Sequence, residues 1–168
     1  MRSDSHSPSH YFVLKADSRR FAVPIRDVAK IIPALYVTRI PDSPPEIEGY
    51  FDFHGDLLPL LNLRCRLGLN KRPLQADDVI VIVHLTEDIR LGLLADEAEG
   101  LVDAESLTKP GKFGSSDETS AVQKMESETQ AQVFGDKDGI ILAYRVSQLL
   151  TRKLMVWLDG LTDKVQGV

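Results

Sequence analysis

Short runs of apolar side chains, separated by turn-forming residues, occupy most of this chain from residue 10 onward. Runs of roughly four to eight residues rich in Val, Ile, Leu, Phe and Tyr are typical of β-strands. They group into four predicted hairpins, with strands at 11–16 and 20–25, 49–53 and 57–61, 79–85 and 90–95, and 128–134 and 139–144. The run after the third hairpin continues to residue 102. Many short strands with turns between them predict a mainly β fold, a barrel or a sandwich.

Helical spacing is found in only a few places. Residues 26–32 place Val28, Ile31 and Ile32 on one side of a short helix, which Pro33 would end. The β-rich segment 36–40 follows.

Two further helices are expected later in the chain. Asn62 is a suitable N-cap for a single turn that Gly68 would stop. Leucines at helical spacing predict a last helix over 146–158. Residues 110–124 have few large apolar side chains and are expected to form a mobile loop.

Composition narrows the classes of function. The net charge of -5 argues against nucleic-acid binding, which needs clustered Lys and Arg. No apolar run approaches the ~20 residues that span a bilayer, so we expect no membrane insertion. The polar N-terminus lacks the apolar core of a signal peptide. A single cysteine cannot form an internal disulfide. These features together predict a cytoplasmic protein.

Three local patterns suggest chemistry without completing a site. They are Cys65 between two arginines that could lower its pKa, the acidic group Asp96, Glu97 and Glu99, and the run 136–139, which resembles part of a calcium loop. A half-buried thiol, a solvated strand end and a hairpin turn explain them more simply. We therefore expect no catalytic residue, no cofactor and no metal. A small-ligand-binding β-barrel protein is the alternative from another functional class.

The run from Gly49 to Arg64 is more specific than any of these patterns. It resembles the signature of the CheW-like family, in which a glycine, an Asn-Leu-Arg-Gly-type turn, a proline and an Asp-Leu-Arg follow in fixed register. Weaker matches surround it in the family's order: 11–25 resembles the opening hairpin, 28–31 a Val-x-Glu-Ile helix, 38–41 and 44–45 a proline-rich approach, 91–98 a Gly-Leu-Leu-Val-Asp-Glu-Val strand, and 134–150 the closing hairpin and helix.

This resemblance covers about residues 10–155 and implies a fold. The family fold is two small five-stranded β-barrel subdomains that share a core, with short helices and a C-terminal helix. On this basis residues 1–9 are expected to be a disordered tail and residues 161–168 a C-terminal tail. The CheW-like domain would lie over 10–160, with two subdomains that cannot be separated into independent domains.

The resemblance also implies a function, that of a non-enzymatic adaptor in bacterial chemotaxis-like signal transduction. In the family, one barrel meets the regulatory domain of the histidine kinase CheA, and the groove between the barrels takes the helical tip of a chemoreceptor. Carried over to matching positions, the partner-binding residues expected here are Val28, Lys30, Thr38, Arg39, Asp52, His54 and Gly55. An adaptor of this kind would be recruited to membrane receptor arrays without entering the membrane.

The chain departs from the family at positions where partners bind. The arginine of the family's turn is replaced by His54, and the glutamate of its helix by Lys30, which reverses the charge. The Asp of the Asp-Leu-Arg motif is Asn62. Charges at the rim of an interface control the choice of partner more than the fold. These departures favour an altered partner, and a CheW-like module of a non-flagellar pathway, such as pilus or gliding control, is the alternative function.

Overall fold

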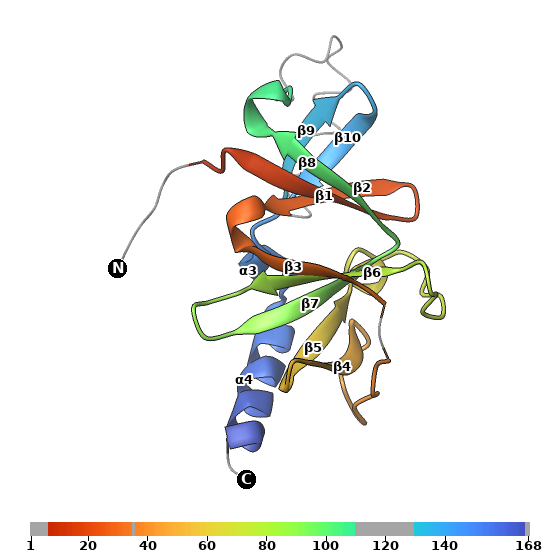
Figure 1. The fold of residues 1–168 in the computed structure, drawn as a ribbon, viewed down its shortest axis with the longest axis vertical. Coiled ribbons are helices and arrows are strands. Elements are labelled where there is room, and N and C mark those ends of the chain that lie inside the picture. The colour runs from red at the N-terminus through yellow and green to blue at the C-terminus, as the bar shows by residue number, and fades with distance from the viewer. Residues whose placement is uncertain (1–6, 35, 110–129, 167–168) are drawn as a thin grey trace.

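The structure is a computed structural model that describes residues 7–34, 36–109 and 130–166, with side chains up to residue 161. Its described strands form two five-stranded sheets (Figure 1). The strands are β1 (His10–Ala16), β2 (Arg19–Pro24), β3 (Val28–Pro33), β4 (Ile47–Phe53), β5 (Asp56–Asn62), β6 (Val79–His84), β7 (Arg90–Ala95), β8 (Glu97–Asp103), β9 (Gln132–Asp136) and β10 (Gly139–Ala143). The helices are η1 (Ile25–Asp27), α1 (Leu63–Arg66), η2 (Ala104–Ser106), α3 (Val146–Leu149) and α4 (Arg152–Gln166).

The two sheets have the same topology. Subdomain A has the strand order β8-β1-β2-β10-β9, and subdomain B has the order β3-β6-β7-β5-β4. In each order the third and fourth strands are parallel and the other neighbours are antiparallel. Subdomain B uses consecutive strands, whereas subdomain A takes β1 and β2 from before it and β8 to β10 from after it. Subdomain A is therefore a circular permutation of subdomain B.

The edge strands of each sheet are joined by a single bridge at equivalent positions. Thr38, which follows edge strand β3, bridges to Tyr50 on the opposite edge strand β4. Thr108, which follows edge strand β8, bridges to Gly135 on β9. The predicted fold of two five-stranded subdomains with a shared core is confirmed, although neither sheet closes into a continuous barrel. The predicted strand at 36–40 is wrong in extent, because only this one bridge forms there.

Apolar side chains from both faces of the sheets form the core. On β6, Val81 and Val83 belong to the cluster shared by the two subdomains, whereas Ile80 and Ile82 belong to the interior of subdomain B. A strand that is buried on both faces has a nearly continuous apolar sequence. This double burial explains the unbroken apolar runs of the predicted hairpins, all four of which are present, with shifts of a few residues at their ends.

The C-terminal helix is divided and longer than predicted. Helix α3 ends at Leu149, and the Thr151 hydroxyl accepts a hydrogen bond from the Leu154 amide at 3.2 Å. A threonine placed this way caps the start of a new helix, so α4 begins at Arg152. Its backbone continues to Gln166 and includes most of the expected tail. No helix in the described part is long and apolar enough to cross a membrane. The expected loop at 110–124 and most of the expected N-terminal tail lie outside the described residues.

Candidate functional site: two bulged edge strands and a hairpin edge

Edge strand β8 has a β-bulge at Glu99. Ala98 pairs with Leu14 and Leu101 pairs with Phe12, but Glu99 has no partner on β1. Residues three apart on a regular strand face opposite sides of the sheet. The extra residue of a bulge reverses this alternation, so Ala98 and Leu101 lie on the same face as Leu14 and Phe12. That face points toward the core shared by the two subdomains.

Edge strand β3 has a matching bulge at Ala29. Val28 pairs with Val83 and Ile31 pairs with Val81, and both partners belong to the shared core. The bulge again places two residues three apart on one face. The predicted helix at 26–32 is therefore wrong beyond η1, because a bulged strand produces the same apolar spacing as a helical turn.

We call the four apolar residues that the two bulged edge strands turn toward the shared-core side the seam. It consists of Val28 and Ile31 on β3 and Ala98 and Leu101 on β8. Val28 and Ala98 are half-buried against the shared core, whereas Ile31 is 40% and Leu101 61% exposed. Both strands are edge strands of their sheets, and Figure 1 shows β8 crossing the upper subdomain and β3 running across the middle of the molecule. Exposed aliphatic side chains next to half-buried ones make this group a candidate protein-docking surface.

Lys30 lies on β3 between the two seam residues of that strand. It pairs with Ile82, which faces the interior of subdomain B, so its backbone position is on the face away from the seam. Its side chain is exposed and makes no salt bridge among the described residues. The positive charge is therefore available to a partner that approaches β3.

The β4–β5 hairpin carries the second group of predicted residues. His54 and Gly55 both have positive φ, 54° and 90°, as a two-residue hairpin turn requires. The Asp52 side chain accepts a hydrogen bond from the Gly55 amide at 2.7 Å. The His54 ring lies edge-on to Phe53 with centroids 4.4 Å apart. Asp52 thus stabilises the turn, and His54 is exposed at its tip.

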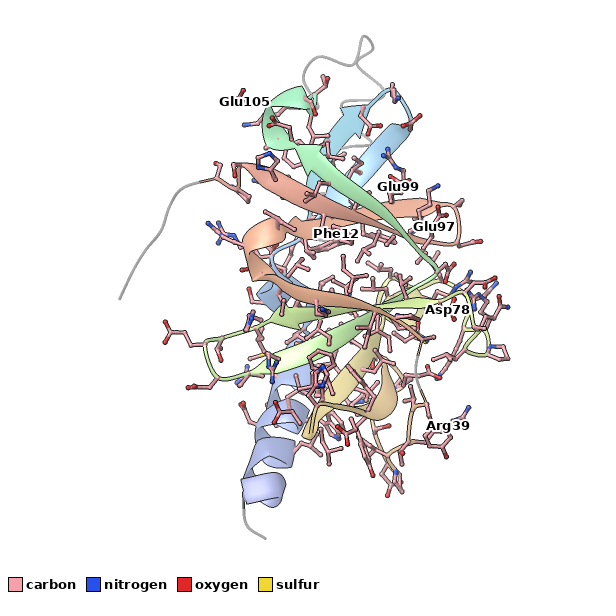
Figure 2. All side chains as sticks on the ribbon, viewed as in Figure 1. Phe12, Arg39, Asp78, Glu97, Glu99 and Glu105 are labelled. Carbon is pink, nitrogen blue, oxygen red and sulfur yellow. The ribbon has the colours of Figure 1, made fainter. Side chains whose placement is uncertain are left out.

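Thr38 and Arg39 run along the other side of β4. The Thr38 and Tyr50 backbones exchange two hydrogen bonds of 2.9 Å each. Gly49 permits this approach, because a Cβ at Gly49 would lie 2.2 Å from the Thr38 carbonyl oxygen. Arg39 is exposed beside this bridge (Figure 2).

The structure separates the seven predicted partner residues into two groups. Val28 and Lys30 lie on β3, whereas Thr38, Arg39, Asp52, His54 and Gly55 lie along β4, the opposite edge strand of the same sheet. Sequence reasoning missed Ile31, Ala98 and Leu101 as surface residues. The signal for these residues is the spacing of three between apolar side chains, at 28 and 31 and at 98 and 101, which in β3 also fits the predicted helix.

Two of the three candidate carboxylates, Asp96 and Glu99, are paired with arginines, and Glu97 lies 3.8 Å from Lys15. Asp96 accepts a hydrogen bond from Arg64 Nε at 2.9 Å and lies 3.0 Å from Arg72 Nη2. Burial alone would raise the pKa of Asp96, but hydrogen bonds from Arg64 and the Asp17 amide hold it below its usual value. Burial raises the pKa of Cys65, opposite to the direction its neighbouring arginines suggested.

Arg20 of β2 makes a similar arrangement at the end of subdomain A, which we call the Arg20 clasp. Its Nε donates to both Glu99 carboxylate oxygens at 3.0 Å, and Nη1 donates to Asp136 Oδ1 at 2.7 Å. Nη2 donates to Glu99 at 2.8 Å and to Asp136 at 2.9 Å. These carboxylates therefore serve as structural ion-pair partners. No described group of three His, Cys, Asp or Glu side chains could hold a metal ion.

Comparisons with known proteins agree with this geometry. The family model described as CheW-like domain matches residues 10–152. Chemotaxis protein CheW of Bacillus subtilis is 26% identical over 102 residues, 61% of this chain and 65% of the relative. Chemotaxis protein CheW of Helicobacter pylori is 29% identical over 69 residues, 41% of this chain and 42% of the relative. Protein PilI of Pseudomonas aeruginosa is 31% identical over 84 residues, 49% of this chain and 46% of the relative.

A solved structure is similar in fold. The scaffolding protein TtCheW from Thermoanaerobacter tengcongensis superposes with a TM-score of 0.62 at 22% identity, over 82% of this chain and 88% of that chain. The matched stretches span between about two fifths and two thirds of the curated relatives' length. Because the family model matches most of the chain, we conclude that this protein belongs to the CheW-like family.

Proposed function

We propose that this protein is a non-enzymatic adaptor that couples chemoreceptors to a CheA-type histidine kinase in chemotaxis-like signal transduction. The observation that carries the proposal is the seam, where two bulged edge strands present Ile31 and Leu101 to solvent above a shared core. Such a surface in a CheW-like chain fits protein docking better than chemistry. An adaptor of this kind acts in the cytoplasm, at the membrane-bound arrays of its receptors.

The seam is the proposed docking surface for the helical tip of a receptor. A helix that lies on another protein uses a stripe of apolar side chains about every third or fourth residue. The seam offers two apolar side chains on each of two strands, with the shared core beneath them. Lys30, on the opposite face of β3, favours a partner that also places a carboxylate near that face of the strand.

The edge along β4 is the proposed docking surface for the kinase regulatory domain. Thr38, Arg39, Asp52, His54 and Gly55 share this edge, and the hairpin turn and the Thr38 bridge fix its backbone. A pre-organised edge loses little conformational entropy on binding.

The charge changes at Lys30 and His54 favour a partner other than a standard chemotaxis kinase–receptor pair. We expect wild-type protein to bind a standard CheA regulatory domain and receptor tip weakly, and the double change Lys30→Glu plus His54→Arg to strengthen this binding. Wild-type binding at the strength of an ordinary CheW, unchanged by the double substitution, would contradict altered specificity.

Co-purification of the tagged protein from its own cells, with partners identified by mass spectrometry, tests the main proposal. We expect a chemoreceptor and a CheA-type kinase. A Leu101→Ala variant should lose the receptor selectively. Recovery of neither partner would overturn the proposed function.

A CheW-like module of a non-flagellar pathway is the second candidate. It is favoured by the match to PilI, at 31% identity over 84 residues, and by the changed charges. The same co-purification separates the candidates, because the kinase and receptor recovered identify the pathway.

A further inference from the structure

We propose that Arg20 is a positioning residue for the seam: it fixes the Glu99 bulge of β8 and thereby directs Leu101 and Ala98 toward the docking partner. The partner in this inference rests on the proposed function, but the action of Arg20 on β8 can be measured without a partner. Arg20 itself is only 8% exposed.

The clasp joins three strands that are far apart in the sequence. Arg20 lies on β2, Glu99 on β8 and Asp136 on β9, and β8 and β9 are the two edge strands of subdomain A. Every guanidinium nitrogen of Arg20 donates to at least one of the two carboxylates. A planar guanidinium that holds two carboxylates fixes both distance and orientation, which a lysine cannot do.

The residue that Arg20 holds is the bulge residue itself. Glu99 is the extra residue that reverses the alternation of β8, so its position decides whether Ala98 and Leu101 share a face. Without an anchor, β8 could shift its register by one residue and turn Leu101 away from the seam. Lys15 adds a second contact to Glu99 at 3.2 Å, and its longer contact to Glu97 is 3.8 Å.

Subdomain B has no clasp at the position equivalent to Arg20. Arg20 pairs with Ile141 in the parallel ladder of subdomain A, and the equivalent residue in subdomain B is Gly92, which pairs with Leu60. A Cβ at Gly92 would lie 2.7 Å from the Phe51 ring, so apolar side chains already fill that space. The bulge residue of β3 is Ala29, which has no polar side chain to hold. The charged anchor is therefore specific to β8.

The environment of Glu99 supports a role for Arg20 in holding this side chain. Burial alone would raise the pKa of Glu99, but hydrogen bonds from Arg20 and Lys15 outweigh it and hold the pKa below its usual value. Hydrogen bonds from Arg20 likewise lower the pKa of Asp136. Both carboxylates are thus ionised at neutral pH, when the clasp is complete.

Backbone hydrogen exchange of the free protein tests the clasp. We expect Arg20→Gln to accelerate exchange of the amides of residues 98–102 by about tenfold or more relative to central strand β6. Glu99→Gln, which keeps the side-chain shape, should give a smaller acceleration at the same residues. Arg20→Lys should lie between Arg20→Gln and wild type. Arg19→Gln, on the exposed neighbour, should leave the pattern unchanged.

The outcomes separate positioning from general stability. Acceleration confined to β8 supports the inference, whereas equal acceleration in β8 and β6, or none in either variant, overturns it. A second arm measures the affinity of the variants for the receptor helical tip recovered by co-purification. We expect Arg20→Gln to weaken binding by about tenfold and Arg19→Gln to leave it unchanged. Failure of wild type to bind the tip would overturn the proposed function, while the exchange arm would still decide the clasp.

Discussion

Subdomains A and B have one topology, and both have apolar interiors, but they differ at one equivalent position. In subdomain B, Phe51, Leu60 and Ile80 close around Gly92 and leave no room for a Cβ. In subdomain A, the equivalent position holds Arg20, whose charge is matched by Glu99 and Asp136. The order and direction of strands are thus compatible with either apolar packing or a paired ionic group at this position. The residue type that fits a position depends on the side chains around it and not on the strand topology alone.

The features common to both subdomains are located at their edges. Each edge pair is joined by one threonine bridge, and each first edge strand has a bulge that places two apolar residues on the seam face. These bridges and bulges occur in both subdomains, and the proposed docking surfaces are located on the same edge strands.

Disrupting the threonine bridge of subdomain B should cause the largest loss of stability. Gly49→Ala places a Cβ 2.2 Å from the Thr38 carbonyl oxygen at a φ of +153°. Strain and overlap together should cost about 4 kcal/mol in the free energy of unfolding, measured in urea. Gly100→Ala is the control, since its φ is +123° but no atom lies within 4 Å of the added Cβ. Equal losses in the two variants would show that the close approach at Gly49 is unimportant.

Breaking the Arg20 clasp should have the next largest effect. Arg20→Met leaves two partly buried carboxylates without this cation, which should cost about 3 kcal/mol near pH 7. Denaturant unfolding checks this value against Arg19→Gln, which should change stability by less than about 0.5 kcal/mol. A loss of similar size in both variants would argue that the clasp contributes nothing specific.

Adding one carbon at the equivalent position of subdomain B should cost somewhat less. Gly92→Ala brings a Cβ to 2.9 Å from the side chains of both Ile80 and Leu60, beside the Phe51 ring. Overpacking of this kind should destabilise the protein by about 2 kcal/mol. A stabilised Gly92→Ala protein, as unfolding curves would reveal it, would mean that the interior of subdomain B has free space.

Lowering the pH should reduce the difference in stability between wild type and Arg20→Met. The pKa values of Glu99 and Asp136 are lower in the folded than in the unfolded state, so the clasp stabilises the protein above the unfolded values of about 4. This contribution should be lost progressively as the pH falls through the folded pKa values. Thermal unfolding between pH 7 and pH 3 tests the sign. A difference that grows on acidification would refute it.

Much of the fold could be predicted from the sequence, because strand hairpins are local. The run from Gly49 to Arg64 predicted the β4–β5 hairpin and the Asn62 cap, whose side chain accepts a hydrogen bond from the Cys65 amide. The bulges could not be predicted, since a spacing of three indicates a helix unless the partner strand is known. The partners of Arg20 lie 79 and 116 residues away, beyond any local pattern.

The site was predicted less completely than the fold. Of the positions carried over from the family, Lys30, Arg39 and His54 are exposed. The exposure of Leu101 could not be predicted, because whether a strand leucine is exposed or buried depends on how its strand pairs with the neighbouring strand. Whether these residues bind partners stays a prediction.

The central claim is that the seam docks a receptor-type helix. Calorimetric titration of the receptor helical tip against wild type, Leu101→Ala and Ile140→Ala tests it most directly. The control Ile140 is also a large exposed aliphatic residue, 48% exposed on β10, but it lies outside the seam. We predict about tenfold weaker binding for Leu101→Ala and an unchanged affinity for Ile140→Ala, with all three proteins equally stable. Unchanged binding by Leu101→Ala, or an equal loss in both variants, would contradict the account.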